Sequence, residues 1–403
     1  MRSLYSVCAV LKATSARCGV RLLVAVLGFT ALPALADWQD PLQTPAMATT
    51  KAHKNLLLDI TNAGDRLVAV GERGHVIASD DDGFSWLQAK VPVISTLTAV
   101  YFVDENTGWA VGHDGVVIKS VDGGLSWKKQ FDGFKANEMV LEQAKARKAQ
   151  REDELNTAKV MGNPRRIEEA EENLETATFA LEDAQYDYED RSTKPLLDVW
   201  FKDAKQGYVI GAYGMIFKTR DGGETWTDWS SHVENPNRYH LNAIAYIDEG
   251  KMMIAGEAGL LLRTSDDGEQ WEQMFSPYEG SFFGITNLES QNVQVAYGLR
   301  GNVARTDTFG SNWKLVDSGT EQTLMGATDR RGRVVYIVGN GGAFIKGIDL
   351  GRKWESSIRE GRTGAASIIQ SAAGHFVVVG ENGVELLSTL GEPLPEQVKS
   401  IGG

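Results

Sequence analysis

The chain has 403 residues, of which 42% are hydrophobic and 24% charged, and its formal net charge is −13. This length and apolar content suffice for one or two domains with a large core. The acidic balance argues against nucleic acid and anionic membrane surfaces as partners, so a basic or neutral protein partner fits better.

The first 36 residues have the pattern of a secretory signal peptide. Basic residues precede an apolar stretch at 22–30, and Ala-Leu-Ala at 34–36 offers a cleavage site. The apolar stretch is too short to span a bilayer. Both cysteines, Cys8 and Cys18, lie inside this segment, and the absence of a later Cys argues against a lipoprotein. We expect cleavage after residue 36 and a periplasmic or secreted protein.

An irregular N-terminal segment follows at residues 37–54 and contains Trp38. From residue 55 the chain repeats one short frame, whose clearest copy is VGHDGVVIKSVDGGLSW at 111–127. Six copies end in Trp fifteen positions after a leading Gly. The leading glycines are Gly71, Gly112, Gly211, Gly256, Gly298, Gly339 and Gly380.

Repeats of about 40 residues built from short strands and turns are typical of propellers, one four-stranded blade per repeat. Consecutive apolar residues in the third strand of each repeat, such as Val117-Ile118, indicate a strand covered on both faces, as neighbouring blades would cover it. We therefore predict an all-β fold, a seven-bladed β-propeller with blades 1–2 in residues 55–132 and blades 3–7 in residues 195–403.

Residues 133–194 interrupt the propeller with two charged, Ala-rich stretches separated by Met161-Gly-Asn-Pro164. The spacing predicts helices over about 135–160 and 165–190, joined as an antiparallel coiled-coil hairpin. The second helix carries a seam at spacings of three and four, composed of Ile167, Ala170, Leu174, Ala177, Leu181, Ala184 and Tyr188. We expect the first helix to pair with the acidic second helix through its basic group Lys145, Arg147, Lys148 and Arg151. The hairpin should stand on the face that carries the turns between strands two and three.

The seventh repeat has no Trp and no evident fourth strand. Because an open blade leaves an unpaired edge and an uncovered face, a ring needs closure. We expect residues 37–54 to complete the seventh blade, with Trp38 at the position of the missing Trp.

Four copies contain a turn of the form Ser/Thr-x-Asp-x-Gly-x-x-Trp, with Asp81, Asp122, Asp221 and Asp266 at its centre. This turn resembles the Asp-box, or BNR repeat, of sialidases and several other glycosidase families. An Asp that accepts backbone N–H bonds stiffens a tight turn, so the motif indicates a fold and not a catalytic site.

Catalytic chemistry has little support in the sequence. Asp59 and Asp198 lie on central strands and are the pair that an Asp-box glycoside hydrolase of the sialidase-like class would need. Nothing in the pattern selects them as a pair, so this enzyme class is the alternative to a binding protein. The six histidines are scattered, and no phosphate loop or dinucleotide motif is present. We expect no catalytic residue, no cofactor and no metal.

The turns between strands two and three vary within the repeated frame, and they should form a mixed ring around one mouth of the channel. Loops on a rigid scaffold are where binding usually resides. The candidate partner-binding residues are Glu72, Arg73, His113, Asp114, Tyr213, Glu257, Arg300, Asn340 and Glu381.

Apart from the hairpin, the chain resembles the exported seven-bladed propellers of the photosystem II assembly and stability factor family, in repeats such as GLLLRTSDDGEQW at 259–271. The resemblance implies a non-enzymatic factor that binds a membrane protein, contacted here from the periplasm as an inner-membrane complex. It implies a photosystem or, for relatives in other bacteria, an RND-type exporter, and it offers Arg73 and Arg300 as arginine contacts. The hairpin departs from the photosynthetic members.

Overall fold

A computed structural model describes residues 40–191, 193–288, 292–330, 333–395 and 398–401. The expected signal peptide and Trp38 lie outside the described residues, as does the cleavage site. No helix of the described residues is long and apolar enough to cross a membrane.

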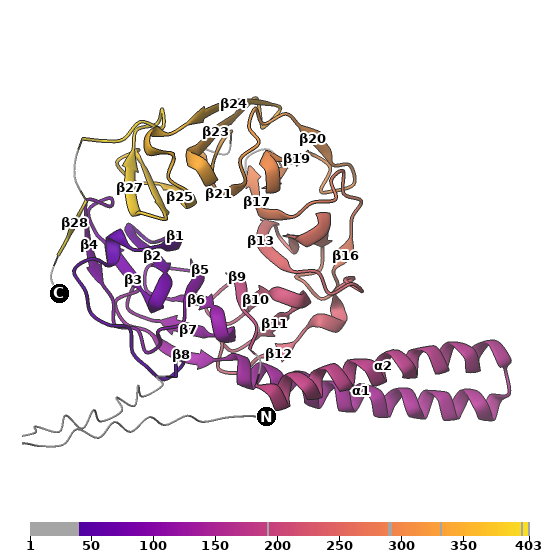
Figure 1. The fold of residues 1–403 in the computed structure, drawn as a ribbon. Helices are drawn as coiled ribbons and strands as arrows, with labels where there is room; N and C mark the ends of the chain where they lie inside the picture. Colours follow the sequence, from indigo (N-terminus) through magenta and orange to yellow (C-terminus); the bar gives the residue numbers. More distant parts are fainter. Residues whose placement is uncertain (1–39, 192, 289–291, 331–332, 396–397, 402–403) are drawn as a thin grey trace, which may run out of the picture. The chain divides into compact units, whose positions relative to one another are not determined.

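The described strands form seven antiparallel sheets, each continuous in sequence except for one added strand (Figure 1). The first sheet contains β1 (Leu57–Ala63), β2 (Arg66–Gly71), β3 (Val76–Ser79), β4 (Ser85–Gln88) and, in parallel with β4, β28 (Lys399–Ser400). The second contains β5 (Leu97–Phe102), β6 (Gly108–Gly112), β7 (Val117–Ser120) and β8 (Lys128–Phe131). The third contains β9 (Leu196–Phe201), β10 (Gly207–Gly211), β11 (Ile216–Thr219) and β12 (Thr227–Asp228).

The remaining sheets repeat this order. The fourth contains β13 (Leu241–Asp248), β14 (Lys251–Gly256), β15 (Leu261–Thr264) and β16 (Glu272–Gln273), and the fifth β17 (Phe282–Leu288), β18 (Val293–Gly298), β19 (Val303–Thr306) and β20 (Lys314–Val316). The sixth contains β21 (Leu324–Arg330), β22 (Val334–Gly339), β23 (Ala343–Ile348) and β24 (Lys353–Ile358). The seventh has three strands, β25 (Ala365–Gln370), β26 (Phe376–Gly380) and β27 (Gly383–Leu387).

The sheets are the blades of a propeller. The first strand of each sheet contacts the first strand of the next, and β25 contacts β1, so the innermost strands surround a common centre (Figure 1). Each hydrophobic cluster between blades draws side chains from two neighbours, which is why the third strands are buried on both faces. The predicted all-β propeller with an inserted helical hairpin is confirmed.

The first and last blades meet through apolar packing. Leu67 and Trp86 of the first blade lie in one cluster with Val377 and Leu386 of the seventh. In the seventh blade, the chain after β27 folds back, and the Leu394 N–H donates to the Leu386 carbonyl at 2.8 Å. The described part of the N-terminal segment bonds to the first blade: the Ala46 N–H donates to Val91 at 3.0 Å. The role predicted for Trp38 stays a prediction.

The Asp-boxes are built as the sequence indicates. In the second blade the Ser120 hydroxyl donates to Asp122 at 2.8 Å and accepts the Gly124 N–H at 2.9 Å. Asp122 also accepts the Ser126 N–H at 2.9 Å, and these bonds lower its pKa although burial opposes them. The indole N–H of Trp127 donates to the Gly124 carbonyl at 2.9 Å. The turn therefore has a structural role, because its polar groups are hydrogen-bonded to one another.

The insertion between the second and third blades is a pair of helices, α1 (Gly133–Met161) and α2 (Pro164–Asp190). Asp132 caps α1 by accepting the Lys135 N–H, and Asn163 caps α2 before its first-turn Pro. The seam of α2 buries Ala170, Ala177 and Ala184. Tyr188, predicted for the same seam, is 48% exposed instead.

The predicted charge pairing between the helices is wrong for most of the basic group of α1. Lys145 bonds to Glu142, Lys148 to Glu152 and Arg151 to Glu154, all within α1 at spacings of three or four. The one ion pair between the described helices joins Lys159 to Glu171 at 3.6 Å. Residues three or four positions apart lie on the same helix face, so an ion pair between them costs little side-chain entropy. Such pairs are therefore favoured over pairs between the two helices.

Candidate functional site

Short 3-10 turns join the second and third strands of the blades. They are η2 (Glu72–Gly74), η3 (His113–Gly115), η4 (Ala212–Gly214), η6 (Glu257–Gly259), η8 (Leu299–Gly301) and η9 (Asn340–Gly342). The middle residue of each is left-handed, with φ between 52° and 60°. The third residue is Gly because the segment entering the next blade crosses there: a Cβ on Gly74 would lie 2.1 Å from the Val93 carbonyl oxygen.

The nine candidate residues all lie on these turns or on the matching bend after β26. Most of them are exposed, namely Arg73, His113, Tyr213, Arg300, Asn340 and Glu381. Arg73, Tyr213 and Arg300 have a left-handed backbone, which is uncommon for residues other than glycine. The middle position of these turns therefore carries a side chain at a conformation that glycine would adopt more easily. These side chains stay available for a partner, a role that remains a prediction.

Three acidic candidates already have bonds within the propeller. Asp114 accepts the Ser95 hydroxyl at 2.7 Å and the Thr193 hydroxyl at 3.2 Å. Glu257 accepts the His240 N–H at 3.1 Å, and Glu381 accepts the Gly364 N–H at 3.0 Å. These acids fix segments that enter the blades to the turns, so they shape the mouth.

Sequence reasoning missed a second set of residues at the same mouth. The segments that enter each blade cross the turns, and they contribute Lys194, Arg238 and Arg362. Lys194 lies 5.3 Å from the ring centre of Tyr213, and Arg238 pairs with Asp183 of α2 at 3.4 Å. The signal that could have found them is their position just before the first strand of a blade. The mouth is therefore richer in cations than the turns alone indicate.

The root of the hairpin lies beside these turns. Gly133 begins α1 against Asp114 and Gly115, where a Cβ on Gly133 would lie 2.8 Å from the Asp114 carbonyl oxygen. The Thr193 hydroxyl bonds to Asp114 from the return side of the hairpin. The contacts agree with the predicted placement of the hairpin on the face of the turns.

The central strands bring two carboxyl groups into the channel. Each innermost strand has a bulge, and Asp59 and Asp198 occupy the position after it in the first and third blades. Burial raises the pKa of Asp59 to about 6. Burial, with the nearby charge of Asp59, raises the pKa of Asp198 to about 7. At neutral pH Asp198 is therefore partly protonated, whereas Asp59 is mostly ionised.

These carboxyl groups join the blades. Asp59 accepts the Val100 N–H of the second blade at 2.9 Å and the Ser367 hydroxyl of the seventh at 2.9 Å. Asp198 accepts the Ile244 N–H of the fourth blade at 2.8 Å. The arrangement links the innermost strands and leaves little acceptor capacity for a substrate.

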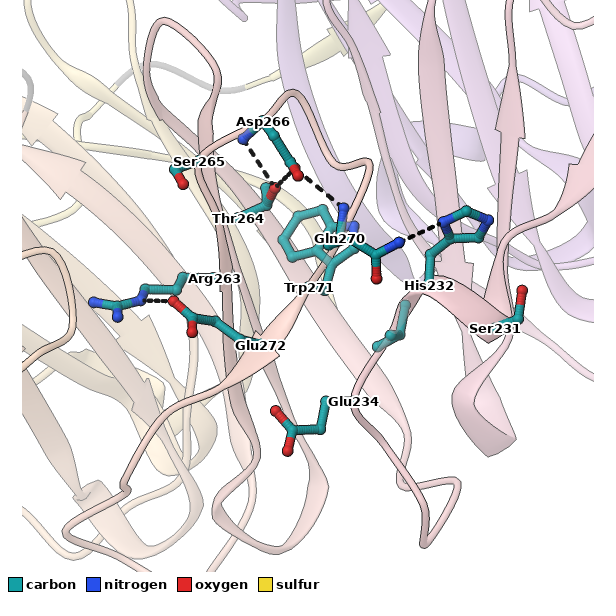
Figure 2. A pocket seen from close by; sticks show the side chains of 11 residues that line it. Ser231, His232, Glu234, Arg263, Thr264, Ser265, Asp266, Gln270, Trp271 and Glu272 are labelled. Atoms are coloured by element: carbon teal, nitrogen blue, oxygen red, sulfur yellow. Dashed lines mark hydrogen bonds and ion pairs between the residues drawn. The ribbon is translucent and has the colours of Figure 1, made fainter. Parts of the chain in front are cut away.

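A separate polar pocket of about 570 Å³ lies at the fourth Asp-box (Figure 2). Arg263 bonds to Glu272 at 2.6 Å, and Gln270 contacts His232 at 3.2 Å. Figure 2 shows that several of these side chains bond to one another, whereas the buried indole nitrogen of Trp271 has no partner among the described residues. No group of three metal-ligating side chains occurs among the described residues.

Comparisons with known proteins identify relatives of part of the chain. Residues 182–331 match the family model described as photosynthesis system II assembly factor YCF48. The photosystem II assembly lipoprotein Ycf48 of Parasynechococcus marenigrum (strain WH8102) is 36% identical over 157 residues, 38% of this chain and 44% of the relative. That of Synechococcus sp. (strain CC9605) is 38% identical over 152 residues, 37% of this chain and 45% of the relative. The chain thus spans less than half the length of the curated relatives it matches.

Solved structures match over most of the chain. The structure titled "YCF48 bound to D1 peptide" is 15% identical, covers 89% of this chain and 99% of its own, and has a TM-score of 0.57. The WD40 propeller domain of Doa1 reaches the same score at 10% identity, covering 87% of this chain and 96% of its own. At these identities the likeness shows a propeller fold. The resemblance to the photosystem II assembly factor family is confirmed in sequence over residues 182–331, where the chain is similar to Ycf48.

Proposed function

We propose that this protein is a non-catalytic, exported scaffold that binds a membrane-protein complex as an assembly or accessory factor. The observation that carries the proposal is the sequence match to the Ycf48 model, whose matched relatives are named assembly lipoproteins. A Ycf48 structure of the same fold is titled as bound to a peptide. None of these names mentions an exporter, so the exporter partner rests on the sequence resemblance alone.

The mouth supplies the contacts such a scaffold needs. Arg73 and Arg300 are exposed, and neither forms an ion pair with an acid among the described residues. Lys194 lies beside the exposed ring of Tyr213, and both Lys194 and Arg238 pair with acids of α2, Asp187 and Asp183. Arginine and tyrosine are the residues that most often anchor protein interfaces. A partner with a carboxylate or an acidic segment fits this mouth.

A glycoside hydrolase is not favoured. Its carboxylates would be Asp59 and Asp198, which hold backbone N–H groups of neighbouring blades. An inverting or retaining enzyme needs one acid and one base free to face a glycosidic bond.

Deletion of the hairpin tests the proposal. Replacing residues 135–190 with a short Gly-Ser turn should leave a folded ring, because strands of the second and third blades supply most of the cluster around Phe131 and Trp226, to which α1 adds only Ala136, Met139 and Val140. We expect co-purification of the membrane complex to be lost while the melting temperature changes little. A matched control replaces only the hairpin tip, residues 155–170, and retains the root.

The mouth is tested separately. Arg73→Ala combined with Arg300→Ala should weaken capture of the partner, whereas Arg165→Ala combined with Arg166→Ala at the hairpin tip should not. Unchanged capture in both the hairpin deletion and the mouth variant would reject the proposal. Fractionation of cells, with the N-terminus of the mature chain sequenced, tests export and cleavage after residue 36.

A further inference from the structure

The outermost strands of several blades are covered by an extra extended segment that runs parallel to them. In the second blade, the Lys90 N–H donates to the Leu125 carbonyl and the Trp127 N–H donates to the Lys90 carbonyl, both at 3.0 Å. In the fourth, the Trp271 N–H donates to the His232 carbonyl at 2.8 Å. In the first, β28 covers β4 in the same direction. In the second and fourth blades this segment is the link from the preceding blade.

The third blade lacks this cover, and there the hairpin takes the place of the link. Among the described residues, the outer strands of the fifth and sixth blades pair with no such segment either. The chain passes from β8 straight into α1 at Gly133. Among the described residues, no backbone segment pairs with residues 224–226 in the way that Lys90 pairs beside Trp127. An uncovered strand edge offers N–H and C=O groups to an added strand.

A groove of about 440 Å³ lies along this edge. One of its walls is a single face of α1, formed by residues at spacings of three and four. It is lined by Gln130, Phe131, Lys135, Glu138, Met139, Glu142, Glu224, Thr225 and Trp226. The Gln143 amide donates to the Asp228 carbonyl at 3.2 Å and holds the helix at the strand end. The volume is within the range of ligand pockets, about 300–1,000 Å³.

Two buried polar atoms at this groove lack partners. Trp226 is 7% exposed, and its indole nitrogen makes no hydrogen bond, nor does Oε1 of Gln130, among the described residues. The equivalent Trp86 indole donates to Gly83 at 2.8 Å, but those of Trp271 and Trp313 also lack a partner. The unpaired Gln130 Oε1 is therefore the atom particular to this groove. Buried polar groups are nearly always paired, so unsatisfied ones at a groove indicate a site that a ligand completes.

The charged residues of the groove indicate the chemistry of the ligand that fits it. Glu138, Glu142 and Glu224 line the groove with one base, Lys135, whose ammonium group donates to the Gln130 carbonyl at 3.1 Å. Glu142 also pairs with Lys145 outside the groove at 2.8 Å. Met139, packed against the cluster of Phe131 and Trp226, provides an apolar floor. An extended peptide with a cation beside apolar side chains complements both features.

We propose that this groove binds an extended segment of the protein partner by strand addition, parallel to residues 224–226, with a Lys or Arg flanked by small or apolar residues. Two covering segments of the chain have this pattern: Ala89-Lys90-Val91 covers the second blade, and Lys399-Ser400-Ile401 the first. The segment that covers the fourth blade, His232-Val233-Glu234, has no Lys or Arg, so the cation is inferred from the acids of the groove. Hydrogen bonds between the two main chains then give affinity, and the carboxylates of Glu138, Glu142 and Glu224 give specificity for a cation. The site is separate from the channel mouth, and it rests on the proposed function only in that the segment belongs to the partner.

The test uses the full chain and a fluorescein-labelled peptide with the sequence of residues 87–95, LQAKVPVIS. Fluorescence anisotropy should show saturable binding that weakens with salt. Glu138→Lys combined with Glu142→Lys should weaken it about tenfold, because two attractive charges become repulsive. Glu175→Lys combined with Glu182→Lys is the matched control on α2, and it should change affinity less than about twofold.

A second measurement leaves the protein untouched. Replacing the lysine of the peptide with glutamate should abolish binding to the unaltered chain. Absence of saturable binding, or equal binding by both double variants, overturns the proposal. A dimer in sedimentation velocity that the Glu138→Lys, Glu142→Lys variant dissociates would assign the groove to a second copy and also overturn it. None of these readouts depends on capture of the membrane complex, so the groove and the proposed function fail separately.

Discussion

Replacement of Asp198 by asparagine should flatten the dependence of stability on pH. Burial raises the pKa of Asp198 to about 7, and the charge of Asp59 contributes in the same direction. An aspartate in an unfolded chain titrates near pH 4 (about 3.9). Between these values the folded protein holds a proton that the unfolded chain has released. The stabilising contribution is therefore complete below about pH 4, and it is lost as the pH rises through about 7.

The magnitude follows from the linkage relation. Each pH unit in that window lowers the free energy of unfolding by about 1.4 kcal/mol for one such group. From about pH 5 to pH 7.5, Asp198 alone should lower it by about 3 kcal/mol. The asparagine amide of the variant does not titrate in this range. It still offers one oxygen to the Val199 or Ile244 N–H, so the cost of the substitution is a constant offset.

Urea denaturation followed by Trp fluorescence at about pH 5, 6 and 7.5 measures this difference. Asp190→Asn at the end of α2 removes the same formal charge at an exposed position and serves as the control. The reasoning is refuted if the Asp198→Asn variant retains the slope of the unaltered protein between pH 5 and 7.5.

Three further substitutions probe the ring. Asp122→Ala removes the acceptor of the Ser126 N–H and should lower the free energy of unfolding by about 1–3 kcal/mol, measured by urea denaturation. Gly74→Ala places a Cβ 2.1 Å from the Val93 carbonyl oxygen at a φ of +69°, and calorimetry should show a melting temperature lower by several degrees. Leu386→Ala leaves a cavity where the first and seventh blades meet and should lower the free energy of unfolding by about 2–5 kcal/mol. Limited proteolysis should then cut the C-terminal blade first. An unchanged pattern of fragments would contradict the packing of these two blades against each other.

The repeated turn allowed the blades to be placed from sequence because its bonds are local. Ser79, Asp81 and Gly83 lie within five residues, and each bond among them depends on that spacing alone. Even the degenerate fifth box keeps the geometry, since the Thr308 hydroxyl accepts the Asn312 N–H at 3.0 Å in place of a carboxylate. The period of the repeat therefore predicts the blades even where the Asp-box consensus residues are absent.

Contacts between distant segments could not be read in this way. The cation at Arg238 reaches the mouth because the segment entering the fourth blade crosses the turn at Gly214. The pairing of β28 with β4 joins residues more than 300 positions apart with no sequence signal. The ion pairs of α1 formed within that helix, although charge counting favoured α2. Each outcome depends on geometry that the repeat frame does not specify.

The bonds of the channel acids argue against the glycoside hydrolase that the sequence left open as the alternative. An acid–base pair must change protonation while its oxygens approach a substrate. In Asp59, one oxygen holds the Val100 N–H of the next blade and the other holds Ile60 and Ser367. These oxygens are thus already engaged in bonds that join the blades. The raised pKa values of Asp59 and Asp198 are thus a consequence of joining blades in a buried channel, and the exposed arginines at the mouth are the groups left free to meet a partner.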